Sequence, residues 1–289
     1  MCLGGIKLSK IALISDTTSD LNKETVEKYN INILPFRIIY KDKEFKDGID
    51  ITPEEVYQGM KVEVPTSSLP SMQDMEDLYL RLEKDGYTHA IAIPLSTGLS
   101  GIYNALKIVS DNHPNINTCL FDSKSISMGE GALVEACGEL IEAGKSFEEI
   151  VEFLPTLQQR IHLFFVVDTI EYLKRGGRIG KVSGTIAELL NIKPIISVDR
   201  QGIYYTYDKV RGRKQSLNRI VEIANKIISV KKCKVYIMNG YCLPDAQKVY
   251  DDFSKLSNVT SVVFGGDISP VSGVHSGPGL VGVVLVEEA

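Results

Sequence analysis

The chain has 289 residues, enough for one large domain or two smaller ones. Hydrophobic residues make up 44% and charged residues 24%, and this ordinary balance excludes a disordered chain or a fibrous repeat. The net charge of -5 weighs against a nucleic-acid-binding protein, which needs a clustered basic face. The composition therefore predicts a globular protein that does not bind nucleic acid.

The cysteines and the apolar runs bear on where the protein works. Five cysteines are scattered without a C-x-x-C pair, which fits a reducing compartment better than a disulfide framework. The segment from Met1 to Lys10 lacks the apolar run of a signal peptide. No stretch approaches the roughly 20 apolar residues that span a bilayer. We expect a cytoplasmic protein without an integral membrane segment.

In the first half of the chain, short apolar runs alternate with amphipathic segments, which is typical of an α/β protein. Four strands are expected there and a fifth near the middle of the chain, at Lys10 to Asp16, Ile31 to Tyr40, His89 to Leu95, Asn117 to Asp122 and Leu163 to Asp168. Helix starts with the pattern of a capping box are expected at Thr52 to Glu55 and at Ser146 to Glu149.

The second half has a strand and helix set of its own. Strands are expected at Ile195 to Asp199, Ile203 to Val210, Lys234 to Asn239, Val259 to Phe264 and Leu280 to Glu287, and helices at about Arg213 to Ser229 and Leu243 to Leu256. We predict two α/β domains, residues 8–162 and 163–289, each a largely parallel or mixed sheet flanked by helices. The cleft between two such domains is a common place for a ligand.

Motifs for nucleotide binding, hydrolysis and metal binding are not matched. Gly176 to Lys181 resembles a phosphate loop, but Arg175 and Val182 stand where that loop needs Gly and Ser or Thr. No G-x-G-x-x-G follows the first strand. The nearest match to the G-x-S-x-G of serine hydrolases has His275 at the position of the nucleophile. The four histidines are too far apart to suggest a metal site.

Three hydroxyl-rich or glycine-rich loops remain, at Pro65 to Ser71, Ser96 to Gly101 and Gly273 to Gly279. A loop that opens a helix presents free N–H groups and the positive end of the helix dipole, which suits an anion. Capping and turn formation alone are the simpler interpretation of any single loop. Three such loops together, one of them with His275, favour a ligand site.

Two small basic clusters lie outside these loops, at Arg175 to Arg178 and at Arg211 to Lys214. Each is either an ordinary solvated loop or helix start, or a docking patch for a partner or its phosphate groups. From the residues alone, both interpretations stay open.

Five segments in chain order resemble the DegV family. Asp16 to Leu21 is similar to the family's D-S-T-S-D-L opening, and Pro65 to Ser71 to its P-x-T-S-Q-P-S loop. Ser96 to Tyr103 is similar to S-S-x-L-S-G-T-Y, Leu173 to Ile179 to L-x-K-G-G-R-I, and His275 to Gly279 to H-x-G-P-G. The resemblance covers Lys10 to Val286. It implies a two-domain DegV-type fold that binds a fatty acid. For several members it implies the acyl-carrying subunit of a bacterial fatty acid kinase, in phospholipid metabolism.

The resemblance also implies a set of binding residues. The family's carboxylate-binding positions fall on Ser67, Ser68, Thr97 and His275 of this chain. Leu69 stands where the family has Gln, so this chain lacks that amide. Docking of a partner is expected at two residues of the basic clusters, Arg178 and Arg211.

The function implied by the resemblance is that of a carrier without catalytic residues. A long-chain fatty acid is expected in a buried pocket, mostly in the second domain, with its carboxylate held by Ser and Thr hydroxyls and a His. An ATP-dependent kinase partner then forms the acyl phosphate, and no cofactor besides the bound acid is expected. The main alternative is a phosphotransferase or hydrolase that uses His275. A third is a regulatory module that binds protein partners through the basic clusters.

Overall fold

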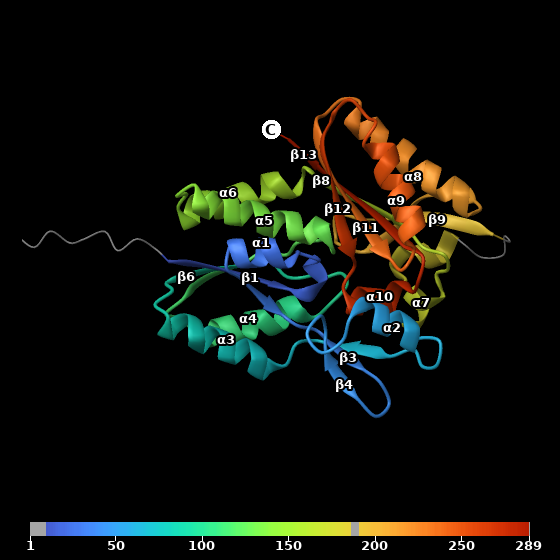
Figure 1. The fold of residues 1–289 in the computed structure, drawn as a ribbon. Coiled ribbons are helices and arrows are strands. Elements are labelled where there is room, and N and C mark those ends of the chain that lie inside the picture. Colours follow the sequence, from blue (N-terminus) through green and yellow to red (C-terminus); the bar gives the residue numbers. More distant parts are fainter. Residues whose placement is uncertain (1–9, 186–190, 289) are drawn as a thin grey trace, which may run out of the picture.

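The computed structural model describes residues 10–185 and 191–288, which form two α/β units (Figure 1). The first unit contains a four-stranded parallel sheet in the order β2-β1-β6-β7. Its strands are β1 (Ile11–Asp16), β2 (Ile31–Leu34), β6 (His89–Ala92) and β7 (Asn117–Leu120). All four lie within the ranges that the sequence predicts.

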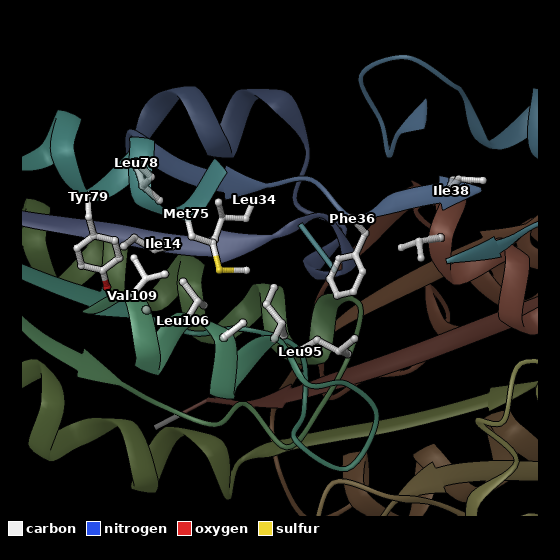
Figure 2. Close-up of a cluster of buried hydrophobic side chains, with 14 of the residues drawn as sticks. Ile14, Leu34, Phe36, Ile38, Met75, Leu78, Tyr79, Leu95, Leu106 and Val109 are labelled. Carbon is white, nitrogen blue, oxygen red and sulfur yellow. The ribbon is translucent and has the colours of Figure 1, made fainter. Parts of the chain in front are cut away.

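Helices cover both faces of the parallel sheet, because successive side chains of each strand point to opposite faces. They are α1 (Lys23–Lys28), α3 (Met72–Lys84), α4 (Ile102–Asn112), α5 (Met128–Glu142) and α6 (Phe147–Gln158). Ile14 of β1 packs with α3 and α4, whereas its neighbour Leu13 packs with α5 and α6. Figure 2 shows the first of these cores, which extends to Phe36 and Leu95.

A small antiparallel sheet, in the order β4-β3-β5, adjoins the first unit. It consists of β3 (Arg37–Ile39), β4 (Glu44–Lys46) and β5 (Thr66–Ser68), with helix α2 (Pro53–Gly59) between β4 and β5. The prediction of one strand over Ile31 to Tyr40 was therefore wrong. Pro35 lies between β2 and β3, which belong to different sheets, and a proline has no N–H for a strand ladder.

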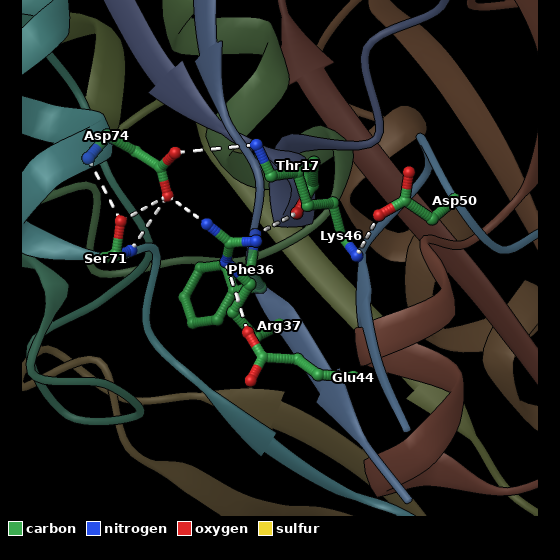
Figure 3. Close-up of polar contacts among 8 residues, drawn as sticks. All are labelled: Thr17, Phe36, Arg37, Glu44, Lys46, Asp50, Ser71 and Asp74. Carbon is green, nitrogen blue, oxygen red and sulfur yellow. Dashed lines mark hydrogen bonds and ion pairs between the residues drawn. The ribbon is translucent and has the colours of Figure 1, made fainter. Parts of the chain in front are cut away.

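An ion pair fastens the small sheet to α3 (Figure 3). Arg37 of β3 binds Asp74, which also forms the capping box of α3 with Ser71. Lys46 of β4 lies 3.6 Å from the same carboxylate. Because β3 pairs directly with β5, this network also holds the strand that carries Ser67.

The second unit contains a six-stranded mixed sheet in the order β10-β9-β8-β13-β11-β12. Its strands are β8 (Ile161–Val166), β9 (Ile192–Val198), β10 (Tyr204–Arg211), β11 (Cys233–Gly240), β12 (Val259–Asp267) and β13 (Leu280–Glu287). β11 and β12 run parallel, and the other neighbours are antiparallel. Helices α8 (Arg213–Ile228) and α9 (Leu243–Phe253) cover one face through a core that includes Ile220 and Phe253.

The other face of the mixed sheet turns toward the first unit, where its Leu163 and Phe165 pack with Met128 of α5. Three short helical segments also belong to the second unit, namely α7 (Glu171–Arg175), η2 (Gly180–Thr185) and α10 (Pro270–Ser276). The mixed sheet begins with β8 at Ile161, two residues before the expected boundary between residues 162 and 163. The expected start of the first domain, at residue 8, lies outside the described residues.

Several local expectations are confirmed. Thr52 and Ser146 each form a capping box at the start of a helix, and β13 spans the predicted Leu280–Glu287. The expected loop from Gly273 to Gly279 was wrong in its first part, since α10 continues to Ser276. Among the described residues, no helix is both long and apolar enough to span a membrane.

Candidate functional site

A largely apolar cavity lies between the open face of the mixed sheet and the first unit. The empty space in the cavity and its mouth, open solvent included, amounts to about 800 Å³. It is lined by Thr18, Phe36, Ser67, Leu95, Leu99, Ser100, Ile126, Ser127, Leu163, Phe164, Phe165, Leu173, Arg178, Tyr204, Met238, Ile268, Val271, Ser272, His275, Ser276, Leu280, Gly282, Val283 and Val284. Of these 24 residues, 16 follow residue 162.

The sheet side of the cavity owes its apolar character to three neighbouring strands. β8, β13 and β11 contribute Phe165, Gly282 and Met238, which are paired across the ladder and thus lie in one row. Val284 lies two residues from Gly282 and so shares its face of the sheet. Phe36 and Leu95 close the cavity from the first unit, so its wall continues the core in Figure 2.

Two predicted site residues meet at the polar end of this cavity. Ser67 Oγ lies 2.7 Å from His275 Nε2, although the two residues are 208 positions apart. Ser67 is the central residue of β5, and His275 lies in the last turn of α10. The structure therefore brings together a strand of the small sheet and a helix of the second unit at one hydrogen bond.

The imidazole of His275 is held in its neutral form. Burial, together with the nearby Arg178 guanidinium, lowers the pKa of His275 to about 4. Its Nδ1 is buried without a hydrogen-bond partner among the described residues. A Cβ atom on Gly176 would lie 2.1 Å from this Nδ1, so the close approach of the ring requires glycine at residue 176.

A second, smaller hollow lies over the same two residues, and we call it the vestibule. It is lined by Val64, Pro65, Thr66, Ser67, Tyr172, Arg175, Gly176, Arg178, Val274 and His275. Ser67, Arg178 and His275 line both the cavity and the vestibule. These three residues thus stand where the apolar cavity meets a hollow with more polar walls, which also include Arg175.

Arg178 belongs to this junction rather than to a separate surface patch. Its guanidinium donates to the carbonyl of Gly176 over 2.6 Å and to that of Leu99 over 3.4 Å. Arg211, the other residue predicted to dock a partner, is the exposed last residue of β10 and lines neither hollow. In the same basic cluster, Arg213 is half-buried and pairs with Asp245.

Two of the predicted carboxylate-binding residues lie outside the cavity. Ser68 follows Ser67 on β5 and is exposed, because neighbouring residues of a strand point to opposite faces. Thr97 is also exposed, and its hydroxyl donates to Asp122 over 2.6 Å. Neither residue lines the cavity or the vestibule, and their part in carboxylate binding stays a prediction.

Ser100 is a cavity residue that the sequence analysis did not assign. It lies three residues after Thr97 in the same S-T-G-L-S-G segment and lines the cavity just before α4 begins. The available signal was its position as the last residue before the Gly101 N-cap, where polar groups gather at the positive end of a helix. Among the described residues, no group of three or more His, Cys, Asp or Glu side chains is arranged to hold a metal ion.

Fold and site together define an α/β protein of two units with a largely apolar cavity between them and polar residues at one end of that cavity. A family model described as "Uncharacterised protein, DegV family" matches residues 10–288. The chain therefore belongs to the DegV family, which confirms the resemblance seen in its motifs. A DegV domain-containing protein of Clostridium acetobutylicum is 59% identical over 281 residues, which cover 97% of this chain and 100% of that relative.

Solved structures similar to this chain include proteins described as binding fatty acids. A fatty-acid-binding DegV family protein from Thermus thermophilus has a TM-score of 0.89 at 26% identity, over 96% of this chain and 100% of its own. A stearic-acid-binding protein from Eubacterium ventriosum has a TM-score of 0.87 at 28% identity, over 96% of this chain and 98% of its own. The two-domain α/β fold expected from the sequence is thus confirmed.

Proposed function

We propose that this chain binds a long-chain fatty acid, with the acyl tail in the cavity and the carboxylate beside Ser67 and His275. The observation that carries the proposal is that Ser67 and His275 line both the apolar cavity and the vestibule. A ligand with a long apolar tail and one polar end matches that arrangement. Fatty acid binding by the similar proteins of Thermus thermophilus and Eubacterium ventriosum supports it.

The tail supplies most of the binding free energy in this proposal. Each buried methylene contributes about 0.8 kcal/mol, so roughly 14 methylenes contribute on the order of 11 kcal/mol before association costs. The head group then needs only enough hydrogen bonds to offset the partial desolvation of the carboxylate. Neutral hydroxyl donors meet that need without a bidentate guanidinium clamp.

The tautomer of His275 decides whether the Ser67 hydroxyl is available to the ligand. A proton on Nδ1 would be a buried donor without a partner, which is rarer in proteins than an unsatisfied acceptor. The proton therefore belongs on Nε2, which donates to Ser67 Oγ across the 2.7 Å contact. The Ser67 O–H is then free to donate to a carboxylate, and Ser100 offers a second hydroxyl in the cavity wall.

We further propose that the bound carboxylate is presented through the vestibule to an ATP-dependent kinase partner. A carboxylate oxygen attacks the γ-phosphorus of ATP held by that partner, ADP leaves, and an acyl phosphate forms. Arg175 and Arg178 line the vestibule and favour the added negative charge. In this division of labour the chain itself is a carrier, which agrees with its unmatched nucleotide motifs.

Two neighbouring serines provide a matched test of the head-group site. Delipidated wild-type protein and the variants Ser67→Ala and Ser68→Ala are titrated with palmitate by isothermal calorimetry. We expect Ser67→Ala to weaken binding about tenfold, because a hydrogen bond to a charged group is lost. Ser68→Ala changes an exposed hydroxyl of the same strand and is expected to bind like wild type. Equal affinities for all three proteins would contradict the head-group assignment.

Docking of the partner is tested separately from lipid binding. Charge reversal at the exposed Arg211 (Arg211→Glu) is expected to lower phosphorylation of the bound acid by a purified fatty acid kinase. Palmitate affinity should stay unchanged, since Arg211 lines neither hollow. Unchanged phosphorylation would remove Arg211 from the docking surface.

A further inference from the structure

Four carboxyl groups of the first unit are largely buried, and two of them contact α10 of the second unit. They belong to Asp16, Asp20, Asp47 and Glu130, and the binding site described above uses none of them. Asp16 and Glu130 share the Thr18 hydroxyl and bond within the first unit. Asp20 and Asp47 instead reach across to the second unit, and this difference suggests a separate role for them.

Asp20 and Asp47 satisfy the backbone at the start of the helix that carries His275. Asp20 Oδ1 accepts from the Ser269 N–H over 2.7 Å, and Asp47 Oδ1 accepts from the Val271 N–H over 3.1 Å. α10 has no capping hydrogen bond from the side chain of its own N-cap residue, Ser269. Two backbone donors at its N-terminus are thus satisfied by residues more than 220 positions earlier in the chain.

The position of α10 decides the position of His275. The helix spans only seven residues, so its anchored N-terminus and His275 in its last turn move as one short rigid segment. Asp20 also accepts from Ser127 Oγ over 2.5 Å, and Ser127 is another residue of the cavity wall. One carboxyl group therefore joins two segments of the wall, one from each unit.

Burying these carboxyl groups costs free energy, and their hydrogen bonds offset only part of it. Burial raises the pKa of Asp20 and of Asp47 to about 7 each. Asp47 Oδ2 is buried without a hydrogen-bond partner among the described residues. An aliphatic side chain would avoid this cost but would leave the N-terminus of α10 without acceptors.

We propose that Asp20 and Asp47 are positioning residues that anchor α10 and so hold His275 against Ser67 at the mouth of the cavity. This inference rests on the proposed function for its effect on the ligand, but not for its effect on His275. Acceptor oxygens, rather than negative charge, are what the anchoring requires. Asn in place of either Asp keeps one such oxygen, whereas Ala keeps none.

The test compares alanine and asparagine variants at both positions. Delipidated Asp20→Ala, Asp20→Asn, Asp47→Ala and Asp47→Asn are prepared with labelled histidine, and the His275 imidazole is titrated by NMR. Only four histidines are present, so a His275→Gln variant assigns the signal. We expect the alanine variants to hydrate the ring and raise the pKa of His275 from about 4 toward 6.5. The asparagine variants should restore the low value.

Palmitate affinity is the second readout, with an expected loss of about tenfold in the alanine variants and recovery in the asparagine variants. Alanine at residue 20 adds backbone strain, because Asp20 has a left-handed backbone with φ of 53°. If Asp20→Ala fails to fold, the comparison of Asp47→Ala with Asp47→Asn still tests the proposal. Glu130→Gln is the matched control, since Glu130 is equally buried but bonds to Ser15 and Thr18 rather than to α10.

Three results would decide the matter. Folded alanine variants with an unchanged His275 titration would overturn the anchoring role, as would a Glu130→Gln variant that shifts His275 equally. Wild-type protein that binds no palmitate would refute the proposed function. In that case the titration of His275 would still show whether Asp20 and Asp47 anchor α10. A failure of the proposed fatty acid binding is therefore distinguishable from a failure of the anchoring role.

Discussion

Buried polar groups are distributed unevenly between the two halves of the molecule. In residues 10–160 the buried side chains include those of Asp16, Asp47 and Glu130, whereas the buried polar side chains after residue 160, among the residues that the structure describes, are serines and Asn239. The open face of the mixed sheet is instead apolar and forms the cavity wall. The cavity takes its polar residues from both halves, with Ser67 from the first and His275 of α10 from the second, whereas most of its apolar surface comes from the second half.

The largest effect on palmitate binding is expected from a substitution that fills the cavity and leaves Ser67, Arg178 and His275 unchanged. A Cβ on Gly282 would lie 3.2 Å from Met238 Cβ, on the cavity face of β13. Gly282→Leu should displace about four methylenes of the tail and weaken palmitate binding about 200-fold, at about 0.8 kcal/mol for each methylene. Calorimetry on delipidated protein measures the loss, and wild-type affinity would contradict the placement of the tail.

The chain length of the ligand sharpens this prediction. An acid shorter by about four methylenes should be less affected by Gly282→Leu than palmitate is, because less of its tail reaches the filled space. An equal loss for both acids would show that the substitution acts on the fold rather than on the space available to the tail.

The second effect concerns stability and comes from the buried carboxyl groups of the first half. Burial raises the pKa of Asp16 to about 6 and that of Asp47 to about 7, above the value of 3.8 for an unfolded chain. Between about pH 4 and pH 7 the folded protein therefore binds more protons than the unfolded chain. Its free energy of unfolding should fall as the pH rises through this window.

Asp47→Asn isolates one of these groups. The variant should lose less stability than wild type between pH 5 and pH 8, by about 2 kcal/mol, since one unit of pKa shift is worth about 1.4 kcal/mol. Urea denaturation at the two pH values measures the difference.

His275 acts in the opposite sense, because its lowered pKa makes the protein lose stability as the pH falls below 6.5. A wild-type protein more stable at pH 8 than at pH 5 would contradict the prediction.

The smallest effect on palmitate binding is expected from a substitution that disturbs the contact between Ser67 of the first half and His275 of the second. Gly176→Ala places a methyl group where His275 Nδ1 lies, so the imidazole must move away from Ser67. We expect palmitate binding to weaken about tenfold, as for loss of a charge-assisted hydrogen bond. Gly177→Ala is no suitable control, since Gly177 has φ of 71°. Ser68→Ala serves as the control instead. If Gly176→Ala binds palmitate as tightly as wild type, the observed position of His275 is not required for ligand binding.

Much of the fold was predictable from local patterns. Continuous apolar runs indicated β1 and β13, and the capping boxes at Thr52 and Ser146 marked two helix starts. The small sheet was not predicted, because its strands have three residues each and two residues of β5 are exposed. Helix α10 was not predicted either, because glycine and proline surround it and its N-terminus is stabilised by distant residues.

The site was predictable only in part. Motif resemblance selected Ser67 and His275, which the structure places 2.7 Å apart. The same resemblance selected Ser68 and Thr97, which lie outside the cavity. Which hydroxyl of a serine-rich segment faces a cavity depends on the pairing of β5 with β3 and on the path of the chain before α4. Such tertiary information is not contained in the motif.

The most direct test of the central claim is mass spectrometry of the ligand itself. Delipidated protein is incubated with a mixture of saturated and unsaturated long-chain fatty acids, separated from free lipid by gel filtration and extracted with organic solvent. We predict about one equivalent of fatty acid per chain, as expected when one acyl tail occupies this cavity. An extract without fatty acid would contradict the proposal that this cavity holds an acyl tail.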